Sequence, residues 1–292
     1  MTFGVPYRGS KNKIVPWALH QLPAAEAFVD LFAGGCAVTH GAMLSGKYRR
    51  FLANDIGDAP QLFRDAINGK YRNERRWISR EKFQELKGSD PYVRYCWSFG
   101  NNAVDYLYSQ GVEPWRKALH YARVYGDRSL LREFGINSDG SRADIVKHEQ
   151  AYKEKYIKWW LSHQGYSEAV SMGRLQSLES LERLERLERL ESLGSLQVTR
   201  KSYDEVELPA DACIYCDPPY RGTAATYCEG FDFGKFDDFL RNADQPIHVS
   251  EYTMPEDFVP IASCYKVKGA DATGLAGYAS EKIFLHEKWA KR

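Results

Sequence analysis

A chain of 292 residues is long enough for one large domain or two domains of ordinary size. Hydrophobic residues make up 43% and charged residues 27%, which is typical of a globular protein and excludes a disordered chain. No apolar run approaches the roughly 18 residues that cross a bilayer, no secretory signal is evident, and six cysteines are too few for a disulfide scaffold. We therefore expect a cytoplasmic protein without a membrane partner.

The first predicted elements are a strand, a glycine turn and a helix. Residues 28–32 form a short apolar run that contains Asp30, and Gly34 and Gly35 follow it directly. Residues 36–44 then have a helical pattern. This order opens many nucleotide-binding α/β units, in which glycine lets the backbone approach a ligand without a clash at Cβ.

A second strand is predicted over 49–55, and it ends in Asp55. At that place a carboxylate accepts hydrogen bonds from ribose hydroxyls or caps a helix, and the residue alone does not separate these roles. The stretch 58–174 contains helical patterns and predicts a mostly helical insertion. It holds 20 Lys and Arg against 15 Asp and Glu, and five of the seven tryptophans. A basic, aromatic-rich segment is typical of a nucleic-acid surface, although aromatic residues build cores equally well.

Leucine recurs at every third residue from Leu175 to Leu196, separated by Gln-Ser, Glu-Ser and Glu-Arg pairs. A period of three falls 60° short of a helical turn at each step, so a long α-helix here would carry leucine on every side. Three alternatives remain: a tight coil with one turn per triplet, a helix whose outer leucines meet another chain, and a tolerated spacer. We therefore expect a monomer by default and keep a repeat-mediated oligomer open.

After the repeat, residues 212–216 form an apolar strand that runs into Asp217-Pro218-Pro219-Tyr220. Further strand patterns stand at 247–250 and 282–285. Strand patterns thus occupy both ends of the chain and helical patterns the middle. This arrangement predicts one α/β domain made from two distant segments, with a second domain between them.

The tetrapeptide after residue 216 has the chemistry that methylation of an aromatic amine requires. The lone pair of such an amine is delocalised into the ring, and two acceptors aimed at its hydrogens would localise it. The Asp217 carboxylate can supply one acceptor and the Pro218 carbonyl the other, because the φ angles of Pro218 and Pro219 are restricted. The Tyr220 ring offers a face for a base taken out of its stack. Taken alone, the same four residues could be an ordinary turn.

These motifs, in this order, resemble the α-group, or D12 class, of DNA adenine N6-methyltransferases. Tyr7-Arg8-Gly9-Ser10-Lys11 resembles the N-terminal motif that contacts S-adenosylmethionine. Asp30-Leu31-Phe32-Ala33-Gly34-Gly35 resembles the glycine-rich loop around its methionine portion, and Ala53-Asn54-Asp55-Ile56 the acidic segment after the second strand. The catalytic Asp-Pro-Pro-Tyr follows the target-recognition domain in that family, as it follows the insertion here.

The resemblance implies a doubly wound, mostly parallel, Rossmann-like methyltransferase sheet with an inserted, mostly helical target-recognition domain. It implies transfer of the methyl of S-adenosylmethionine to adenine N6 in double-stranded DNA after base flipping, and leaves open whether the enzyme serves a restriction-modification system, a phage or a solitary regulatory system. The catalytic domain would span 1–57 and 199–292, and the target-recognition domain 58–198 with the repeat at 175–196. The implied cofactor contacts are Tyr7, Lys11, Asp30, Phe32, Gly34, Gly35, Asp55 and Asp217, and the implied catalytic residues are Asp217, Pro218, Pro219 and Tyr220.

Three further segments have a less specific pattern. Ser98, Asn101 and Asn102 lie where related enzymes have a loop that touches DNA, although a plain Asn-Gly turn fits as well. Residues 201–204 stand where the family often has an aromatic-acid pair near the cofactor adenine, and residues 250–252 could line the target pocket.

A metal centre is not expected. Cys213 and Cys216 have a zinc-like spacing, but no second pair of Cys or His stands at ligand spacing, so buried thiols are favoured. Three rival functions stay open. They are the same chemistry on cytosine N4 or on RNA, a catalytically idle DNA-binding scaffold, and an assembly protein driven by the repeat.

Overall fold

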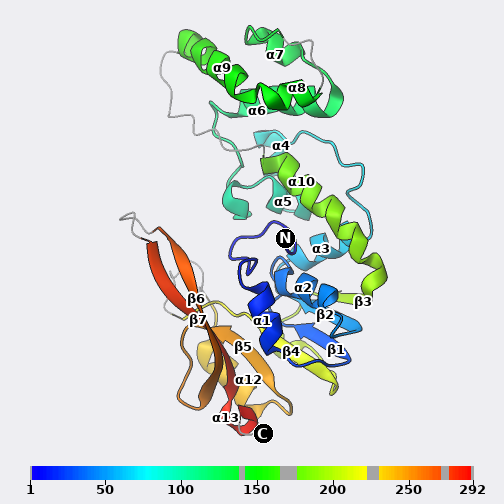
Figure 1. Ribbon diagram of the computed structural model, residues 1–292, viewed down its shortest axis with the longest axis vertical. Coiled ribbons are helices and arrows are strands. Elements are labelled where there is room, and N and C mark those ends of the chain that lie inside the picture. Colours follow the sequence, from blue (N-terminus) through cyan, green and yellow to red (C-terminus); the bar gives the residue numbers. More distant parts are fainter. Residues whose placement is uncertain (1, 138–141, 165–175, 222–229, 271–275, 291–292) are drawn as a thin grey trace. The chain divides into compact units, whose positions relative to one another are not determined.

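The computed structural model describes residues 2–137, 142–164, 176–221, 230–270 and 276–290. The chain divides into two compact units (Figure 1). The first unit joins Met1–Gly69 to Leu184–Arg292, and the second is the continuous segment Lys70–Arg183. No helix in the described parts of the chain is long and apolar enough to cross a membrane.

A seven-stranded sheet forms the centre of the first unit, in the order β3-β2-β1-β4-β5-β7-β6. The first five strands in this order run parallel, whereas β7 is antiparallel to both β5 and β6. The strands are β1 Ala27–Asp30, β2 Arg50–Asn54, β3 Ser195–Thr199, β4 Ala212–Cys216, β5 Ile247–Glu251, β6 Phe258–Ala270 and β7 Ala276–His286. The predicted α/β class with a mostly parallel sheet is therefore confirmed.

Both faces of β1 are covered, and all four of its residues are buried. Successive side chains of a strand point to opposite faces. Val29 lies in one core cluster with Phe236 and Leu240 of the helix α12 (Phe233–Asn242), whereas the ring of Phe28 lies 5.0 Å from that of Tyr48. A strand covered on both sides has a continuous apolar run rather than an alternating one, which is what the sequence of β1 shows.

The helices of the first unit surround this sheet. The helix predicted after the glycine turn is α2, which contacts β1 and α1 and ends at Gly46, a residue in the left-handed region. Seven of its nine residues are buried, so it shows no polar face. The helices and helical turns are α1 Val15–Gln21, α2 Ala37–Ser45, α3 Ala59–Ile67, η3 Glu188–Leu193, η4 Tyr203–Glu205, α12 Phe233–Asn242 and α13 Glu287–Ala290.

The leucine repeat folds as a helix that changes type. An α-helix, α10 (Gln176–Leu187), crosses the boundary between the units and continues as the 3-10 turns of η3. Three residues per turn match the leucine period in η3, as the tight-coil alternative predicts. Leu181, Leu184, Leu187 and Leu190 are buried within the chain, whereas Leu193 of the same repeat is 39% exposed. Leu175 lies outside the described residues.

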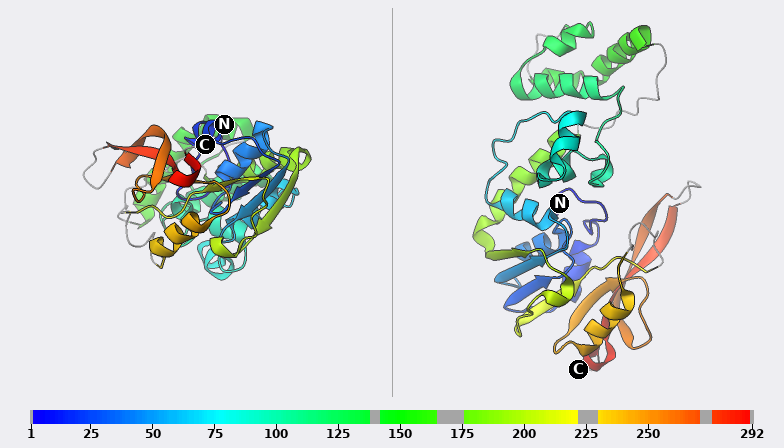
Figure 2. Two further views of the ribbon diagram at one scale, coloured as in Figure 1. Left: turned by 90° about the horizontal axis from the view of Figure 1, so that it is seen from below. Right: turned by 180° about the vertical axis from the view of Figure 1, so that it is seen from behind.

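Two strands have no counterpart among the predicted elements. The edge strand β3 is half-exposed along its length and contains Leu196, which the sequence pattern assigned to the repeat. The other, β6, forms a long hairpin with β7 that extends past the short strand β5 (Figure 2). Several apolar side chains near its start are partly exposed, among them Val259 and Ile261. Edge strands lack the burial pattern on which strand prediction depends.

The named elements of the second unit are helices: α4 Arg80–Leu86, α5 Pro91–Cys96, η1 Phe99–Asn101, α6 Glu113–His120, η2 Tyr121–Tyr125, α7 Ser129–Glu133, α8 Arg142–Lys147 and α9 Glu149–Gln164. Their aromatic residues mainly build a core. Trp115 and Tyr156 stack in one cluster, and Trp97 is buried in contact with Trp77 and Tyr108. Of the two interpretations of the aromatic-rich middle, packing therefore accounts for its most buried tryptophans.

Candidate active site

A cavity of about 720 Å³ opens at the carboxyl ends of β1, β2 and β4. Open α/β sheets bind ligands at this edge, and the volume suits a small organic molecule. All eleven residues predicted as cofactor contacts or catalytic residues line it: Tyr7, Lys11, Asp30, Phe32, Gly34, Gly35, Asp55, Asp217, Pro218, Pro219 and Tyr220. Residues 201–203 and Tyr252, from the less specific segments, line it too. The cavity therefore joins segments more than 200 positions apart in the sequence.

The glycine turn is closely covered by Tyr7. A Cβ atom added to Gly34 would lie 2.8 Å from Cε1 of the Tyr7 ring, and one added to Gly35 would lie 2.5 Å from Cβ of Tyr7. Gly34 also has a φ of +46°, which side-chain-bearing residues rarely adopt. The approach of Tyr7 thus favours glycine at both positions, and the turn itself favours glycine at Gly34.

Asp55 ties the end of β2 to this turn. Its Oδ2 accepts a hydrogen bond from the Gly34 amide at 2.8 Å, and its Oδ1 accepts one from the Gly57 amide at 2.7 Å. Burial raises the pKa of Asp55, and the two amide hydrogen bonds oppose that rise. Asp58, not Asp55, precedes the first turn of α3, so the helix-cap alternative for Asp55 is wrong.

Asp30 is a buried carboxylate at the floor of the cavity, with 1% of its surface exposed. Thr39 donates a hydrogen bond to its Oδ2 at 2.8 Å, whereas Oδ1 has no hydrogen-bond partner among the described residues. Burial raises the pKa of Asp30 to about 7. A buried acceptor that lacks a partner and faces a cavity can receive a donor from a ligand.

A buried ion cluster lies beside the Asp-Pro-Pro-Tyr segment. The Lys11 ammonium nitrogen is 3.0 Å from Oδ1 of Asp217 and 3.2 Å from Oε1 of Glu281. Lys11 also donates a hydrogen bond to the Tyr220 hydroxyl, which in turn donates to Glu281. The ammonium lies 4.1 Å from the centre of the Tyr220 ring. Lys11 is thereby held between two carboxylates and one aromatic ring.

The charged groups of this cluster shift the pKa values of one another. Burial alone would lower the pKa of Lys11, but Asp217 and Glu281 outweigh it and raise that pKa above its ordinary value. Burial raises the pKa of Asp217, Lys11 opposes the rise, and Glu281 adds to it.

Sequence reasoning missed Glu281. It lies on β7, one position before the predicted strand at 282–285, and its side chain is fully buried. One signal could have revealed it: an acidic residue stands directly before an apolar strand pattern. A carboxylate is costly to bury without a partner, so a buried acid at this position indicates a partner in the fold. Phe231 and Lys235 line the cavity as well and were also not predicted.

The loop predicted to touch DNA lies in the second unit. Ser98 is fully buried, and its hydroxyl accepts a hydrogen bond from the Ala103 amide at 3.0 Å. Asn101 donates to the Tyr95 carbonyl at 2.9 Å, and the Asn102 side chain accepts from the amides of residues 104 and 105. These side chains hold the loop in shape, which is the plain-turn alternative. The side chain of Phe99, 65% exposed, is the one that projects from it.

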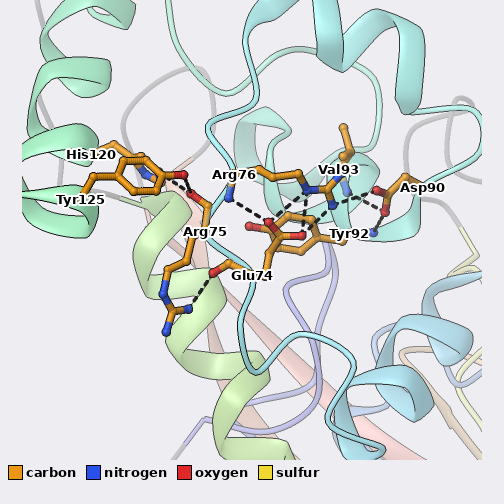
Figure 3. Close-up of polar contacts among 8 residues, drawn as sticks. All are labelled: Glu74, Arg75, Arg76, Asp90, Tyr92, Val93, His120 and Tyr125. Carbon is orange, nitrogen blue, oxygen red and sulfur yellow. Dashed lines mark hydrogen bonds and ion pairs between the residues drawn. The ribbon is translucent and has the colours of Figure 1, made fainter. Parts of the chain in front are cut away.

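A basic segment at the start of the second unit is held by a second set of contacts (Figure 3). Residues 70–76 contain four Lys or Arg and one acid, Glu74. The Glu74 carboxylate binds the Arg76 guanidinium at 2.6 Å, and Arg76 also lies 3.2 Å from Asp90. The carbonyl of Arg75 accepts hydrogen bonds from His120 and Tyr125, while the Arg75 side chain is exposed. The backbone of a strongly charged segment is therefore fixed by neighbouring helices.

Burial lowers the pKa of His120, so its imidazole is neutral at physiological pH. Its Nε2 lies 2.9 Å from the Arg75 carbonyl oxygen, which can only accept, so this nitrogen carries the proton.

Comparison with known protein families gives one match, which covers residues 7–96. The matching family is described as D12 class N6 adenine-specific DNA methyltransferase. A comparison with curated proteins gives no match. The seven-stranded, mostly parallel sheet is consistent with the methyltransferase fold. Residues 7–96 are therefore similar to the D12 class N6 adenine-specific DNA methyltransferase family, whose members are DNA adenine-N6 methyltransferases.

Proposed function

We propose that this protein methylates the exocyclic N6 amine of adenine in duplex DNA after the base has been flipped out of the helix. The similarity of residues 7–96 to the D12 family supports S-adenosylmethionine-dependent adenine N6 methylation of DNA. One observation carries the assignment to this site: Asp217 and the glycine turn, from opposite ends of the chain, line a single cavity. S-Adenosylmethionine, when bound, supplies a methyl group on a positively charged sulfur.

The residues of the glycine side of the cavity fit such a cofactor. The buried Oδ1 of Asp30, which has no hydrogen-bond partner among the described residues, is an acceptor for the ammonium group of an amino acid. Each Asp55 oxygen accepts one backbone hydrogen bond and retains a lone pair for a ribose hydroxyl. Tyr7 and Phe32 supply apolar walls. We assign these residues to binding and orientation of the cofactor.

Asp217 and the Pro218 carbonyl are proposed to accept the two hydrogens of the target amine. Two acceptors draw the nitrogen toward tetrahedral geometry, which localises its lone pair for attack. The proline rings restrict the backbone, so the acceptors are in place before the base arrives. Tyr220 and Tyr252, whose ring centres lie 4.6 Å apart, supply aromatic surface for a flipped base at the same edge of the cavity.

Target recognition is proposed for the second unit, Lys70–Arg183, which occupies most of the predicted domain 58–198. Residues 70–76 carry a formal charge of +3, four cations against one acid. Their backbone is already ordered by the contacts of Glu74, His120 and Tyr125, so little entropy is lost when a phosphate binds. We propose that this basic segment contacts the DNA backbone, and that the loop at residues 98–102 approaches DNA through Phe99.

Arg75→Ala is expected to weaken DNA binding to a similar extent on every sequence, because a phosphate contact carries no base information. Loss of one neutralised phosphate should reduce the slope of log K against log salt concentration by about 0.9. Fluorescence anisotropy at several salt concentrations measures this slope. Lys82→Ala is the matched control, because Lys82 lies in the same unit, is 59% exposed and pairs with Glu85. Equal slopes for both variants would contradict the assignment of the basic segment.

Gly35→Ala is expected to raise the Kd for S-adenosylmethionine by about tenfold or more, since the new methyl group would push Tyr7 off the turn. Calorimetry measures the Kd. Gly88→Ala is the control, because a Cβ there meets nothing within 4 Å. An unchanged Kd would mean that Tyr7 and the turn do not hold the cofactor.

The deciding experiment is transfer of labelled methyl groups from S-adenosylmethionine to unmethylated genomic DNA, followed by nucleoside analysis. Label in N6-methyladenine at a recurring sequence is expected. Label in N4-methylcytosine would retain the fold and overturn the substrate. Absence of label in DNA, with cofactor binding intact, would contradict the proposed function in favour of RNA methylation or a DNA-binding scaffold.

A further inference from the structure

Glu281 is a buried carboxylate that the proposed chemistry does not use directly. Its side chain is fully buried on β7, opposite Cys264 of β6, and it is not among the residues that line the cavity. Ser250 donates a hydrogen bond to its Oε1 at 2.7 Å, and the Tyr220 hydroxyl donates to the same oxygen. Lys11 lies 3.2 Å from this oxygen. Glu281 therefore lies outside the cavity lining and contacts two residues of that lining, Lys11 and Tyr220.

Two buried carboxylates around one ammonium are an unfavourable arrangement for stability alone. Asp217 by itself would neutralise Lys11, which lies 3.0 Å away. The second acid adds a desolvation penalty and repels Asp217. Its position beside a cavity with perturbed ionisable groups indicates a functional rather than a stabilising role.

The amine of an adenine must reach the Asp217 carboxylate, and Lys11 now lies 3.0 Å from one of its two oxygens, Oδ1. Lys11 is a cation with three hydrogen-bond donors, and it competes with the amine for these acceptors. An ammonium that left Asp217 without a second partner would remain buried and unpaired, which is costly. Glu281 removes this cost, because the Lys11 nitrogen is already almost equally close to both carboxylates.

We propose that Glu281 is a positioning residue that takes over the Lys11 ammonium, and keeps the Tyr220 hydroxyl oriented, when the target amine occupies Asp217. The exchange involves hydrogen bonds only. Lys11 stays protonated, no covalent bond forms or breaks, and Asp217 gains the free lone pairs that the amine needs. This inference rests on the proposed function and adds a residue that acts on the target side through Lys11.

A double-mutant cycle tests the inference with the full-length protein, unmethylated DNA and S-adenosylmethionine. Glu281→Gln is expected to lower kcat by about 10- to 100-fold, as for other residues that orient a reacting group, with little change in the KM for S-adenosylmethionine. Lys11→Met should also lower kcat, because it leaves Asp217 facing a second, unneutralised carboxylate. The double variant Lys11→Met/Glu281→Gln is expected to be at least as active as Lys11→Met alone, because Glu281 acts through Lys11.

Losses that multiply in the double variant would overturn the inference, since they would mean that Glu281 acts independently of Lys11. Glu281→Asp keeps the charge with a shorter reach and should recover part of the kcat lost in Glu281→Gln, which a purely structural role would not predict. If Glu281→Gln fails to fold, as judged by circular dichroism, Glu281→Asp replaces it in the cycle. Glu113→Gln, at an ion pair with Arg80 in the second unit, is the control and should leave kcat unchanged.

Methyl transfer by the wild-type protein distinguishes a failure of this inference from a failure of the proposed function. Wild-type methyl transfer to adenine with multiplicative losses would overturn only the role of Glu281. A wild-type protein that binds S-adenosylmethionine but transfers no methyl group to DNA would overturn the proposed function and the inference with it.

Discussion

Asp217→Ala is expected to lower the single-turnover rate of methyl transfer by on the order of 10³-fold while DNA affinity stays within about twofold of wild type. The carboxylate is the proposed acceptor that localises the lone pair of the amine, and water does not replace it in a buried, preorganised site. DNA affinity comes mainly from phosphate contacts, which we place in the second unit. Rapid-quench methylation and fluorescence anisotropy measure the two quantities.

Two further variants make the Asp217 result specific. Asp217→Asn retains an acceptor oxygen and should fall between wild type and alanine in rate. Asp238→Ala removes an acid that is 71% exposed on α12 and should leave the rate unchanged. Turnover by Asp217→Ala at the wild-type rate would contradict the assignment of the Asp-Pro-Pro-Tyr segment as the catalytic site.

Asp30→Asn is expected to weaken S-adenosylmethionine binding and to remove its dependence on pH. The pKa of Asp30 is about 7, raised by burial, so the ionised carboxylate that an ammonium group requires predominates only above that pH. The wild-type Kd should therefore rise by about tenfold per pH unit as pH falls from about 7 to 5. The Kd of the asparagine variant should be high and flat over this range, as calorimetry would show. A flat wild-type profile would contradict the assigned contact.

Asp30→Asn is also expected to be more stable than the wild-type protein at pH 8. A carboxyl whose folded pKa exceeds its unfolded value near 3.9 binds a proton in the folded state over a window from about pH 4 to 7. Stability falls as pH rises through that window, and the full penalty is present above it. Removing the charge should raise the free energy of unfolding by roughly 4 kcal/mol at pH 8, and the difference should vanish near pH 4. Urea unfolding at both pH values measures this.

The elements that follow local rules were predictable. The strand β1, the glycine turn and α2 were expected from an apolar run, two glycines and a helical pattern, and the structure has them within one or two residues. The strand β4 and the Asp-Pro-Pro-Tyr segment after it were expected in the same way. In each case the decisive constraint, a restricted φ angle or a run of side chains to be buried, acts between neighbours in the chain.

The second unit shows the limits of the same reasoning. Composition could not separate an aromatic binding surface from an aromatic core, and packing places Trp97 and Trp115 inside. Ser98 was expected to touch DNA, yet its side chain is buried and supports the loop from within. Whether a polar side chain faces a ligand or its own backbone depends on the fold of the loop, which one-dimensional spacing does not contain.

The chemical groups available to the site, and the turns that present them, follow from the residue types and local φ restrictions of short segments. Which charges meet depends on the tertiary structure. It brings Lys11 to Asp217 and to Glu281, and so sets the pKa of Lys11 and of Asp217. It also placed β3 and β6 at the edges of the sheet, where partial exposure removes the pattern that reveals a strand. Coulomb energies and burial depend on distances across the fold, and these arise only when strands from both ends of the chain pair in one sheet.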